Sequence, residues 1–109
     1  MKKILLNLTL LSLVSSAIEI KQMPLTFTQK RIDLTKEYIK NSYGLEVDNI
    51  NITPKFIVIH HTAMDDLKES FNRFDPEILT SDRKDIQKGG NLNVSAQFFV
   101  DFDGTIYSL

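Results

Sequence analysis

The stretch Phe56-Ile57-Val58-Ile59-His60-His61-Thr62-Ala63 carries the strongest structural signal in the sequence. Its first four side chains are apolar and three of them are β-branched, a composition typical of a central strand that is covered on both faces. Pro54 separates this strand from the polar residues before it. We therefore expect a buried strand over residues 56–59, with both histidines at its carboxyl end.

The two histidines are candidate functional residues, because a strand end holds the backbone still while the side chain can reach a groove. Successive side chains of a strand point to opposite faces, so His60 and His61 cannot easily bind one metal ion together. The pattern indicates one ligand and one supporting residue. A second interpretation is structural, with both imidazoles packed beside the core. The residues alone favour that interpretation, since the chain has two histidines and no cysteine.

Helical signals lie on both sides of the predicted strand. Thr28 is a candidate N-cap for a helix that runs to about Tyr43, with Gly44 just past its end. A shorter helix is expected over residues 66–74, where apolar side chains recur at positions i, i+4 and i+7, and Pro76 ends that pattern.

The carboxyl-terminal part of the chain has the pattern of a β-hairpin. Strands are expected over residues 95–102 and 105–109, joined by a tight turn at Asp103-Gly104. Asp101 and Asp103 are therefore interpreted as turn residues rather than catalytic ones. Residues 77–93 are polar and turn-like. Together these elements predict an α/β fold.

Residues 1–17 have the order of features found in a signal peptide. Lys2 and Lys3 precede an apolar run, and Ser15-Ser16-Ala17 supplies the small residues that a signal peptidase reads. The run is too short to span a bilayer as a helix, which takes about 20 residues. The alternative is a buried N-terminal helix. We expect export to the periplasm or the extracellular space, with no stable membrane anchor after signal cleavage.

Length and composition set the remaining bounds. A chain of 109 residues has room for one domain. Its 13 basic and 14 acidic side chains give no basic patch, so nucleic acid is not an expected partner. The absence of cysteine excludes a disulfide framework.

Two motifs in the right order resemble the N-acetylmuramoyl-L-alanine amidase family, which includes phage lysozyme-type amidases and peptidoglycan-recognition proteins. The first is the histidine stretch quoted above. The second is Asn93-Val94-Ser95-Ala96-Gln97-Phe98-Phe99-Val100-Asp101, followed by Asp103-Gly104-Thr105-Ile106-Tyr107. The resemblance implies a mixed central β-sheet flanked by helices. It divides the chain into a signal peptide (1–17), a helical leader (18–54) and the N-terminal part of an amidase domain (55–109).

The same resemblance implies a zinc ion (Zn²⁺) in a surface groove, held by two histidines and a third ligand. His60 matches the first of these ligands, whereas His61 matches a position that binds no metal and is expected to line the cleft or support the ligand. Gln97 stands where many relatives have a histidine and is a second expected cleft residue. Ala96 replaces a tyrosine that some relatives use, which excludes that mechanism. The catalytic residues stay unknown, since the general base and two ligands are expected beyond Leu109.

For function, the resemblance implies a peptidoglycan hydrolase. Members of the family cut the amide bond between N-acetylmuramic acid and L-alanine of the stem peptide with zinc-activated water. The implied partners are peptidoglycan or muropeptides. We expect this chain to be a truncated or split product that is inactive alone. The alternatives are a non-catalytic muropeptide-binding module and, third, a purely structural protein.

Overall fold

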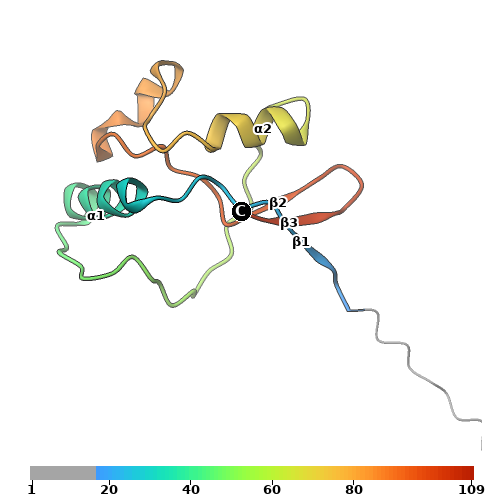
Figure 1. Cartoon of the computed structure of the whole chain (residues 1–109), viewed down its shortest axis with the longest axis horizontal. Coiled ribbons are helices and arrows are strands. Elements are labelled where there is room, and N and C mark those ends of the chain that lie inside the picture. The colour runs from blue at the N-terminus through green and yellow to red at the C-terminus, as the bar shows by residue number, and fades with distance from the viewer. Residues whose placement is uncertain (1–16) are drawn as a thin grey trace, which may run out of the picture.

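The computed structural model describes residues 17–109. The signal peptide predicted over residues 1–17 therefore lies outside the described residues, except for Ala17. Within these residues a first short strand is followed by three helices and then by two further short strands (Figure 1). Their bounds are β1 Ile20–Gln22, α1 Gln29–Tyr43, α2 Leu67–Phe74, the 3-10 helix η1 Ser81–Gly89, β2 Phe98–Val100 and β3 Ile106–Ser108. The fold is α/β, as the sequence predicts.

The three strands form one small mixed sheet in the order β1-β3-β2. β1 runs parallel to β3, with Ile20 opposite Ile106. β2 runs antiparallel to β3, with Phe99 opposite Tyr107. The sequence predicts the β2–β3 hairpin but not β1, because three exposed residues carry no alternating pattern. β1 and β2 are the two edges of this sheet.

The hairpin has shorter strands and a longer turn than the sequence predicts. Asp101 donates its backbone N–H to the Thr105 carbonyl at 2.9 Å, and Gly104 turns the chain with φ 84°. The Asp103 carboxylate accepts the Thr105 N–H at 2.8 Å, and this bond holds the pKa of Asp103 below its usual value. The carboxylates of both acidic residues therefore accept hydrogen bonds within the turn, as the sequence predicts.

Helix α1 has the limits that its capping residues predict. The Thr28 hydroxyl accepts the Lys30 N–H at 3.2 Å at the start of the helix. Gly44 ends it in the left-handed conformation, at φ 68°, and donates its N–H to the Lys40 carbonyl at 2.9 Å. Both local predictions are confirmed.

The helix predicted over residues 66–74 is also confirmed. Two carboxylates accept backbone N–H groups at its amino-terminal end. The Asp66 carboxylate accepts the Glu69 N–H at 2.7 Å, while the Glu69 carboxylate accepts the Asp65 N–H at 3.3 Å. The helix ends before Pro76. No helix within residues 17–109 is both long and apolar enough to cross a bilayer.

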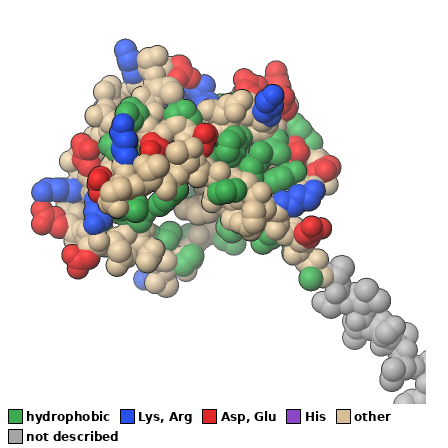
Figure 2. Space-filling view, in the orientation of Figure 1, with side chains coloured by type: hydrophobic (Ala, Val, Ile, Leu, Met, Phe, Trp, Pro, Cys, Tyr) green, Lys and Arg blue, Asp and Glu red, His purple; other side chains and the backbone are tan. Residues whose placement is uncertain are grey.

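The strand predicted over residues 56–59 is wrong for this structure. The segment has no regular secondary structure and pairs with no strand, and its side chains are almost fully exposed. The exposed fractions are 88% for Phe56, 94% for Ile57, 84% for Val58 and 95% for Ile59. The physical reason is that strand propensity expresses a fit to a pleated, partly buried surface, which requires a neighbouring strand. Figure 2 shows hydrophobic side chains at the surface on the side where the sheet lies.

An aromatic contact joins α2 to the sheet. The Phe74 ring on α2 lies with its centroid 5.6 Å from that of Phe99 on β2. Among the described residues, the buried hydrophobic side chains are Leu25, Leu92 and Phe99. Leu92 also forms an isolated antiparallel bridge with Ile78. Because this hydrophobic core is small, polar contacts hold much of the fold together.

The region that the sequence marks as polar and turn-like contains the helix η1, which packs against α1. Gly89 is buried at the end of η1, and a Cβ atom there would meet the Tyr38 ring and the Ser42 hydroxyl of α1. Its missing side chain therefore permits the close approach of the two helices.

We expect Gly89→Ala to lower the free energy of unfolding by about 1–3 kcal/mol, because the added methyl group has no space beside Tyr38. Urea denaturation of the wild type and the variant measures this difference. Removing the ring in a Tyr38→Ala background should make the same substitution less costly. An equal loss of stability in both backgrounds would contradict the close contact between Gly89 and the Tyr38 ring.

Candidate functional site

The two histidines lie in the unpaired segment before α2. Both side chains are exposed. The His61 Nδ1 atom accepts the N–H of Ala63 at 3.2 Å, and Ala63 has a left-handed backbone with φ 56°. Such a conformation is uncommon for a residue other than glycine. The backbone thus turns sharply just after the histidines.

A hydrogen bond between two hydroxyl groups joins this turn to α2. The Ser70 hydroxyl donates to the Thr62 hydroxyl oxygen at 3.2 Å, and Ser70 itself is buried. Phe74, one turn further along the same face of α2, packs on Phe99 of the sheet. The segment after the histidines is therefore bonded to α2, which contacts the sheet through Phe74.

Gln97 lies just before β2 and is exposed, as is Ala96. The backbone carbonyl of Gln97 accepts the N–H of Leu109 at 3.1 Å, so this residue continues the hairpin pairing. No hydrogen bond of the structure joins Gln97 to His60 or His61. The three predicted site residues are thus on the surface but are not brought together by direct bonds.

The donor set within residues 17–109 does not fit a complete zinc site. A catalytic zinc ion takes three protein ligands, and no group of three His, Cys, Asp or Glu side chains in the described part could hold a metal ion. His60 can contribute one imidazole.

Arg31 is the centre of a polar cluster that the sequence does not reveal as such. Its side chain is only 3% exposed, although it is a cation on α1. The guanidinium donates to four backbone carbonyls from different parts of the chain. The acceptors are those of Thr26 (2.7 Å), Asp75 (2.7 Å), Asn93 (3.3 Å) and Phe74 (3.4 Å). Arg31 thus joins α1 to the end of α2 and to the segment before β2.

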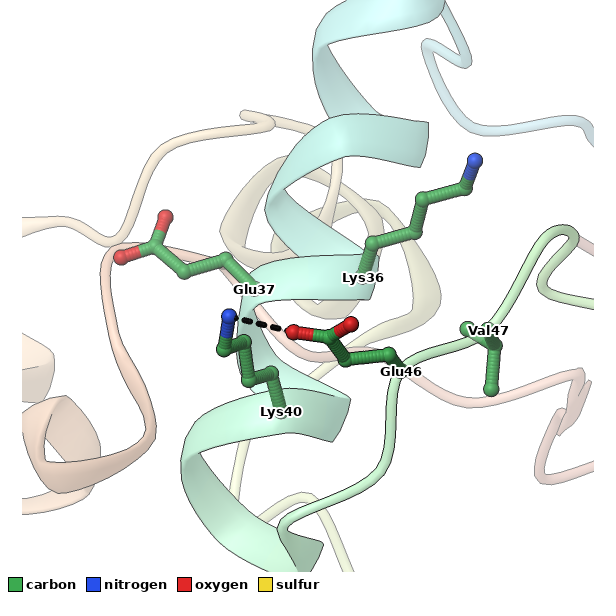
Figure 3. Close-up of a pocket in the computed structure, with 5 residues that line it drawn as sticks. All are labelled: Lys36, Glu37, Lys40, Glu46 and Val47. Carbon is green, nitrogen blue, oxygen red and sulfur yellow. Dashed lines mark hydrogen bonds and ion pairs between the residues drawn. The ribbon is translucent and has the colours of Figure 1, made fainter.

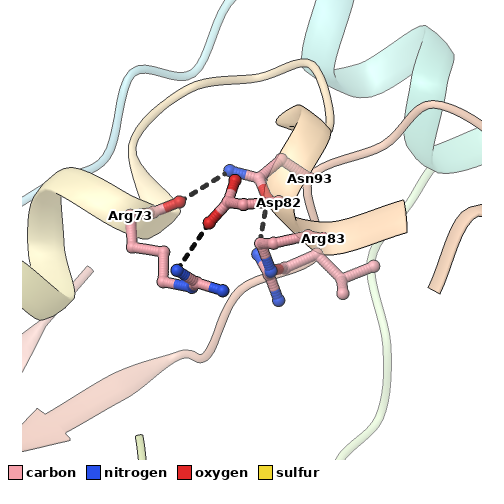
Figure 4. A network of polar contacts seen from close by, with 5 residues as sticks. Arg73, Asp82, Arg83 and Asn93 are labelled. Atoms are coloured by element: carbon pink, nitrogen blue, oxygen red, sulfur yellow. Dashed lines mark hydrogen bonds and ion pairs between the residues drawn. The ribbon is translucent and has the colours of Figure 1, made fainter. Parts of the chain in front are cut away.

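Asn93 is the second buried member of this cluster and is completely inaccessible to solvent. Its side-chain amide donates to the carbonyls of Pro76 at 2.7 Å, Arg73 at 3.0 Å and Phe74 at 3.4 Å. Its amide oxygen accepts from Arg83, as Figure 4 shows. Burial of Asn93 also excludes glycosylation of the Asn93-Val94-Ser95 triplet in the folded chain.

Two arginines, Arg73 and Arg83, lie beside Asn93 and make different contacts (Figure 4). The Arg83 guanidinium lies over the Phe74 ring, 4.8 Å from its centroid, and also donates to the Val94 carbonyl at 3.0 Å. Arg73 forms an ion pair with Asp82 at 2.6 Å nearer the surface. The arginines therefore hold η1 to the end of α2.

Two carboxylates after α2 hold the beginning of α1. Asp75 accepts the Thr26 N–H at 2.6 Å. Glu77 accepts the Thr28 N–H at 2.9 Å, the Thr28 hydroxyl at 2.8 Å and the Arg31 N–H at 3.2 Å. The N–H and then the hydroxyl of Thr28 hold the pKa of Glu77 below its ordinary value. Negative charge at this place also suits the helix N-terminus.

The Glu77 contacts predict a loss of stability in acid. A lowered folded-state pKa means that the carboxylate stabilises the fold fully above the ordinary glutamate value of 4.5, and that this contribution is lost as the pH falls through the folded-state pKa. We expect Glu77→Gln to be less stable than the wild type at pH 7 and to lose less stability between pH 7 and pH 3. Thermal denaturation across that range measures both effects.

Glu46→Gln is the matched control, because it removes one negative charge at an exposed position paired only with Lys40. Its stability should fall in acid as much as that of the wild type. A Glu77→Gln protein with the same acid response as the control would contradict the assigned role of Glu77.

One hollow of the surface has a lining that differs from the residues of the candidate site. It lies between α1 and the loop that follows it (Figure 3) and is lined by Lys36, Glu37, Lys40, Glu46 and Val47. The ion pair of Lys40 with Glu46, at 2.7 Å, closes one side of it. The hollow is shallow and neither histidine lines it, so it does not form part of the candidate site.

Comparison with known families adds to this geometry. The profile of the N-acetylmuramoyl-L-alanine amidase family matches residues 50–109, more than half of the chain. The chain belongs to this amidase family. The matched region includes His60, His61, α2 and the β2–β3 hairpin, which confirms the resemblance of both sequence motifs. No curated protein and no solved structure matches the chain significantly.

The amidase match begins after α1, yet α1 is bonded to the matched region. Arg31 and the backbone of Thr28 make these bonds with residues 75–77 and Asn93. The helix α1 is therefore bonded directly to the region that matches the family.

Sequence reasoning missed Arg31 and Asn93, although each leaves a trace in the sequence. Arg31 lies at helical spacing from Leu34 and Tyr38, so a cation interrupts an apolar helix face. Asn93 lies between Leu92 and Val94. A polar residue on an apolar face is a sign of burial with bonded partners.

Proposed function

We propose that the chain acts on peptidoglycan, and that His60 supplies one ligand to the zinc ion that family members typically use. The observation that supports this proposal is the family match, which includes the apolar run ending at His60. His61, which bonds to the turn after it, and Gln97 at the start of the hairpin are proposed to contact the substrate or support the ligand. The bond acted on by the family joins N-acetylmuramic acid to L-alanine.

We further propose that muropeptide binding, rather than hydrolysis, is the activity of the 109-residue chain by itself. A bound zinc ion would supply Lewis acid chemistry and an activated water, but it needs three protein ligands. Residues 17–109 bring no such set together. Export to the periplasm or the extracellular space, where peptidoglycan is found, is part of the same proposal.

Zinc binding tests the proposed role of His60. We expect the wild type to show a zinc-dependent rise in melting temperature that is lost in His60→Ala and kept in His61→Ala. The two histidines are adjacent and exposed, so each substitution controls for the other. Equal loss in both variants, or none in either, would contradict the assignment of His60.

Binding to substrate is measured separately, by sedimentation of the protein with insoluble peptidoglycan and by calorimetry with a soluble muropeptide. The proposal expects binding without release of stem peptide. Release of stem peptide by the purified chain with stoichiometric zinc would show that the chain is a complete hydrolase. No binding to either ligand would contradict a peptidoglycan function.

A further inference from the structure

Residues 44–66 connect α1 to α2 and form no helix or strand (Figure 1). Within this connection every residue from 51 to 61 is exposed, and Lys55 lies near the middle of that stretch. The peptide bond after Lys55 leads to Phe56, whose side chain is 88% exposed. Exposed connections of this kind are the preferred places of proteolytic cleavage, because a protease can approach the peptide bond from solvent.

Lys55 differs from the other basic residues that the structure describes. Every other lysine and arginine within residues 17–109 lies in a helix or a strand. They are Lys21 in β1, Lys30, Arg31, Lys36 and Lys40 in α1, Lys68 and Arg73 in α2, and Arg83, Lys84 and Lys88 in η1. Cleavage within a helix or a paired strand first requires local unfolding, and the free energy of that opening slows the reaction. Cleavage after Lys55 requires no such opening.

The residues at this bond suit a serine protease that cleaves after basic side chains. Such an enzyme binds lysine or arginine in a pocket that has a carboxylate at its base. Phe56 follows Lys55, and unlike a proline it leaves an ordinary amide N–H at the bond. Hydrolysis consumes one water molecule. Its hydroxyl group joins the carbonyl carbon of Lys55 and its proton goes to the nitrogen of Phe56 as the bond between these two atoms breaks.

The two pieces that this cut would make are bonded to each other at separate places in the fold. β1 pairs with β3, and the N–H of Met23 donates to the Ser108 carbonyl at 2.8 Å. At the buried polar cluster, Arg31 donates to the Asp75 carbonyl at 2.7 Å, and the N–H of Thr26 donates to the Asp75 carboxylate at 2.6 Å. Helix α1 also packs against η1. Each of these contacts joins a residue before the cut to a residue after it.

The hydrogen bonds within the connection lie on one side of the cut. Lys40 donates to the Glu46 carboxylate at 2.7 Å, and the N–H of Asn51 donates to the Asn49 side chain at 3.0 Å. Both pairs come before Lys55 in the sequence. Cleavage after Lys55 therefore leaves these two bonds, the β1–β3 pairing and the polar cluster in place.

We propose that the bond between Lys55 and Phe56 is a processing site for a serine protease of basic specificity, and that the cut chain persists as a two-piece complex with the fold of the intact chain. The cut separates the histidine-bearing segment from α1 along the backbone, while β1 and α1 stay bonded to the rest of the fold. This inference involves neither zinc nor peptidoglycan, so it stands or falls independently of the proposed function.

Limited digestion of the intact chain with trypsin, in native buffer without zinc or peptidoglycan, tests the site. We expect the first cut within residues 17–109 to come after Lys55, at least about ten-fold faster than any cut within α1, α2 or η1. Mass spectrometry of the whole digest over time identifies each cut from the masses of its products. A first cut within one of the three helices would overturn the proposal.

Two glutamine variants make the assignment specific. Lys55→Gln removes the proposed site, and Lys84→Gln is the matched control, because Lys84 is also an exposed lysine but lies in η1. Lys55→Gln should lengthen the survival of the region 17–109 about ten-fold, whereas Lys84→Gln should be digested at the rate of the wild type. Equal survival of the two variants would overturn the assignment of Lys55.

Size-exclusion chromatography of the cut wild-type protein tests whether the two pieces stay together. In native buffer we expect both pieces to elute together at the volume of the intact chain, with an unchanged circular dichroism spectrum. In concentrated urea, which unfolds the chain, they should elute separately. Pieces that already separate in native buffer, or a spectrum that changes to that of unfolded peptide after the cut, would overturn the two-piece complex.

Discussion

Arg31→Ala should lower the free energy of unfolding by about 3 kcal/mol or more, which is a large part of the stability of a small domain. The substitution removes the donors to four backbone carbonyls, those of Thr26, Phe74, Asp75 and Asn93. It leaves the carbonyls of Thr26, Asp75 and Asn93 without the guanidinium donor in a place where Arg31 is 3% exposed, while the Phe74 carbonyl keeps the amide of Asn93 as a donor. Urea denaturation followed by circular dichroism measures the loss.

Two further arginine variants make this prediction specific. Arg31→Lys keeps the charge but has one compact donor group in place of the planar fork, so it should recover only part of the stability. Arg73→Ala is the matched control. Its side chain is 38% exposed and pairs with Asp82, so its loss should cost less than about 1 kcal/mol. If Arg31→Ala were no more harmful than Arg73→Ala, the central role of Arg31 would be wrong.

Helices α1 and α2 could be predicted from the sequence because their signals are local, whereas η1 was missed in the region interpreted as turn-like. Thr28 and Gly44 mark the two ends of α1, and Asp66 with Glu69 marks the start of α2. Each signal acts within one or two turns of the chain, so no knowledge of distant partners is needed. The β2–β3 hairpin was predictable for the same reason, although its strands are shorter than expected.

The strand predicted over residues 56–59 shows the limit of this reasoning. Its apolar composition suits a strand with buried faces. Strand pairing also requires a neighbouring strand, which the local sequence does not specify. The structure instead uses Ile20–Gln22 as the edge strand beside β3. Those three residues are exposed and carry no apolar alternation, so their pairing depends on contacts far along the chain.

The sequence predicts which residues could form the candidate site, but it does not predict how they are arranged in space. The motif ending at His60 and His61 points to the amidase family, and the family match confirms this. The cluster of Arg31, Glu77 and Asn93 is invisible to motif reasoning, because its partners are backbone carbonyls and N–H groups contributed by segments more than 40 residues apart. Such acceptors carry no side-chain signature.

The second large effect is expected for Asn93. Asn93→Ala should lower the free energy of unfolding by about 2–4 kcal/mol, because its buried amide donates to the carbonyls of Arg73, Phe74 and Pro76 and accepts from Arg83. Asn91→Ala is the control. That residue is exposed, and its substitution should change the stability by no more than about 0.5 kcal/mol.

A double-mutant cycle connects this prediction to the first one. Arg31 and Asn93 both donate to the Phe74 carbonyl, each at 3.4 Å, so one donor remains when the other is removed. The combined loss in Arg31→Ala/Asn93→Ala should therefore differ from the sum of the single losses by about 0.5 kcal/mol or more. If the urea denaturation midpoints of the four proteins give additive losses, the two side chains act independently. The buried polar cluster would then not be one cooperative unit that holds the leader helix to the amidase-family region.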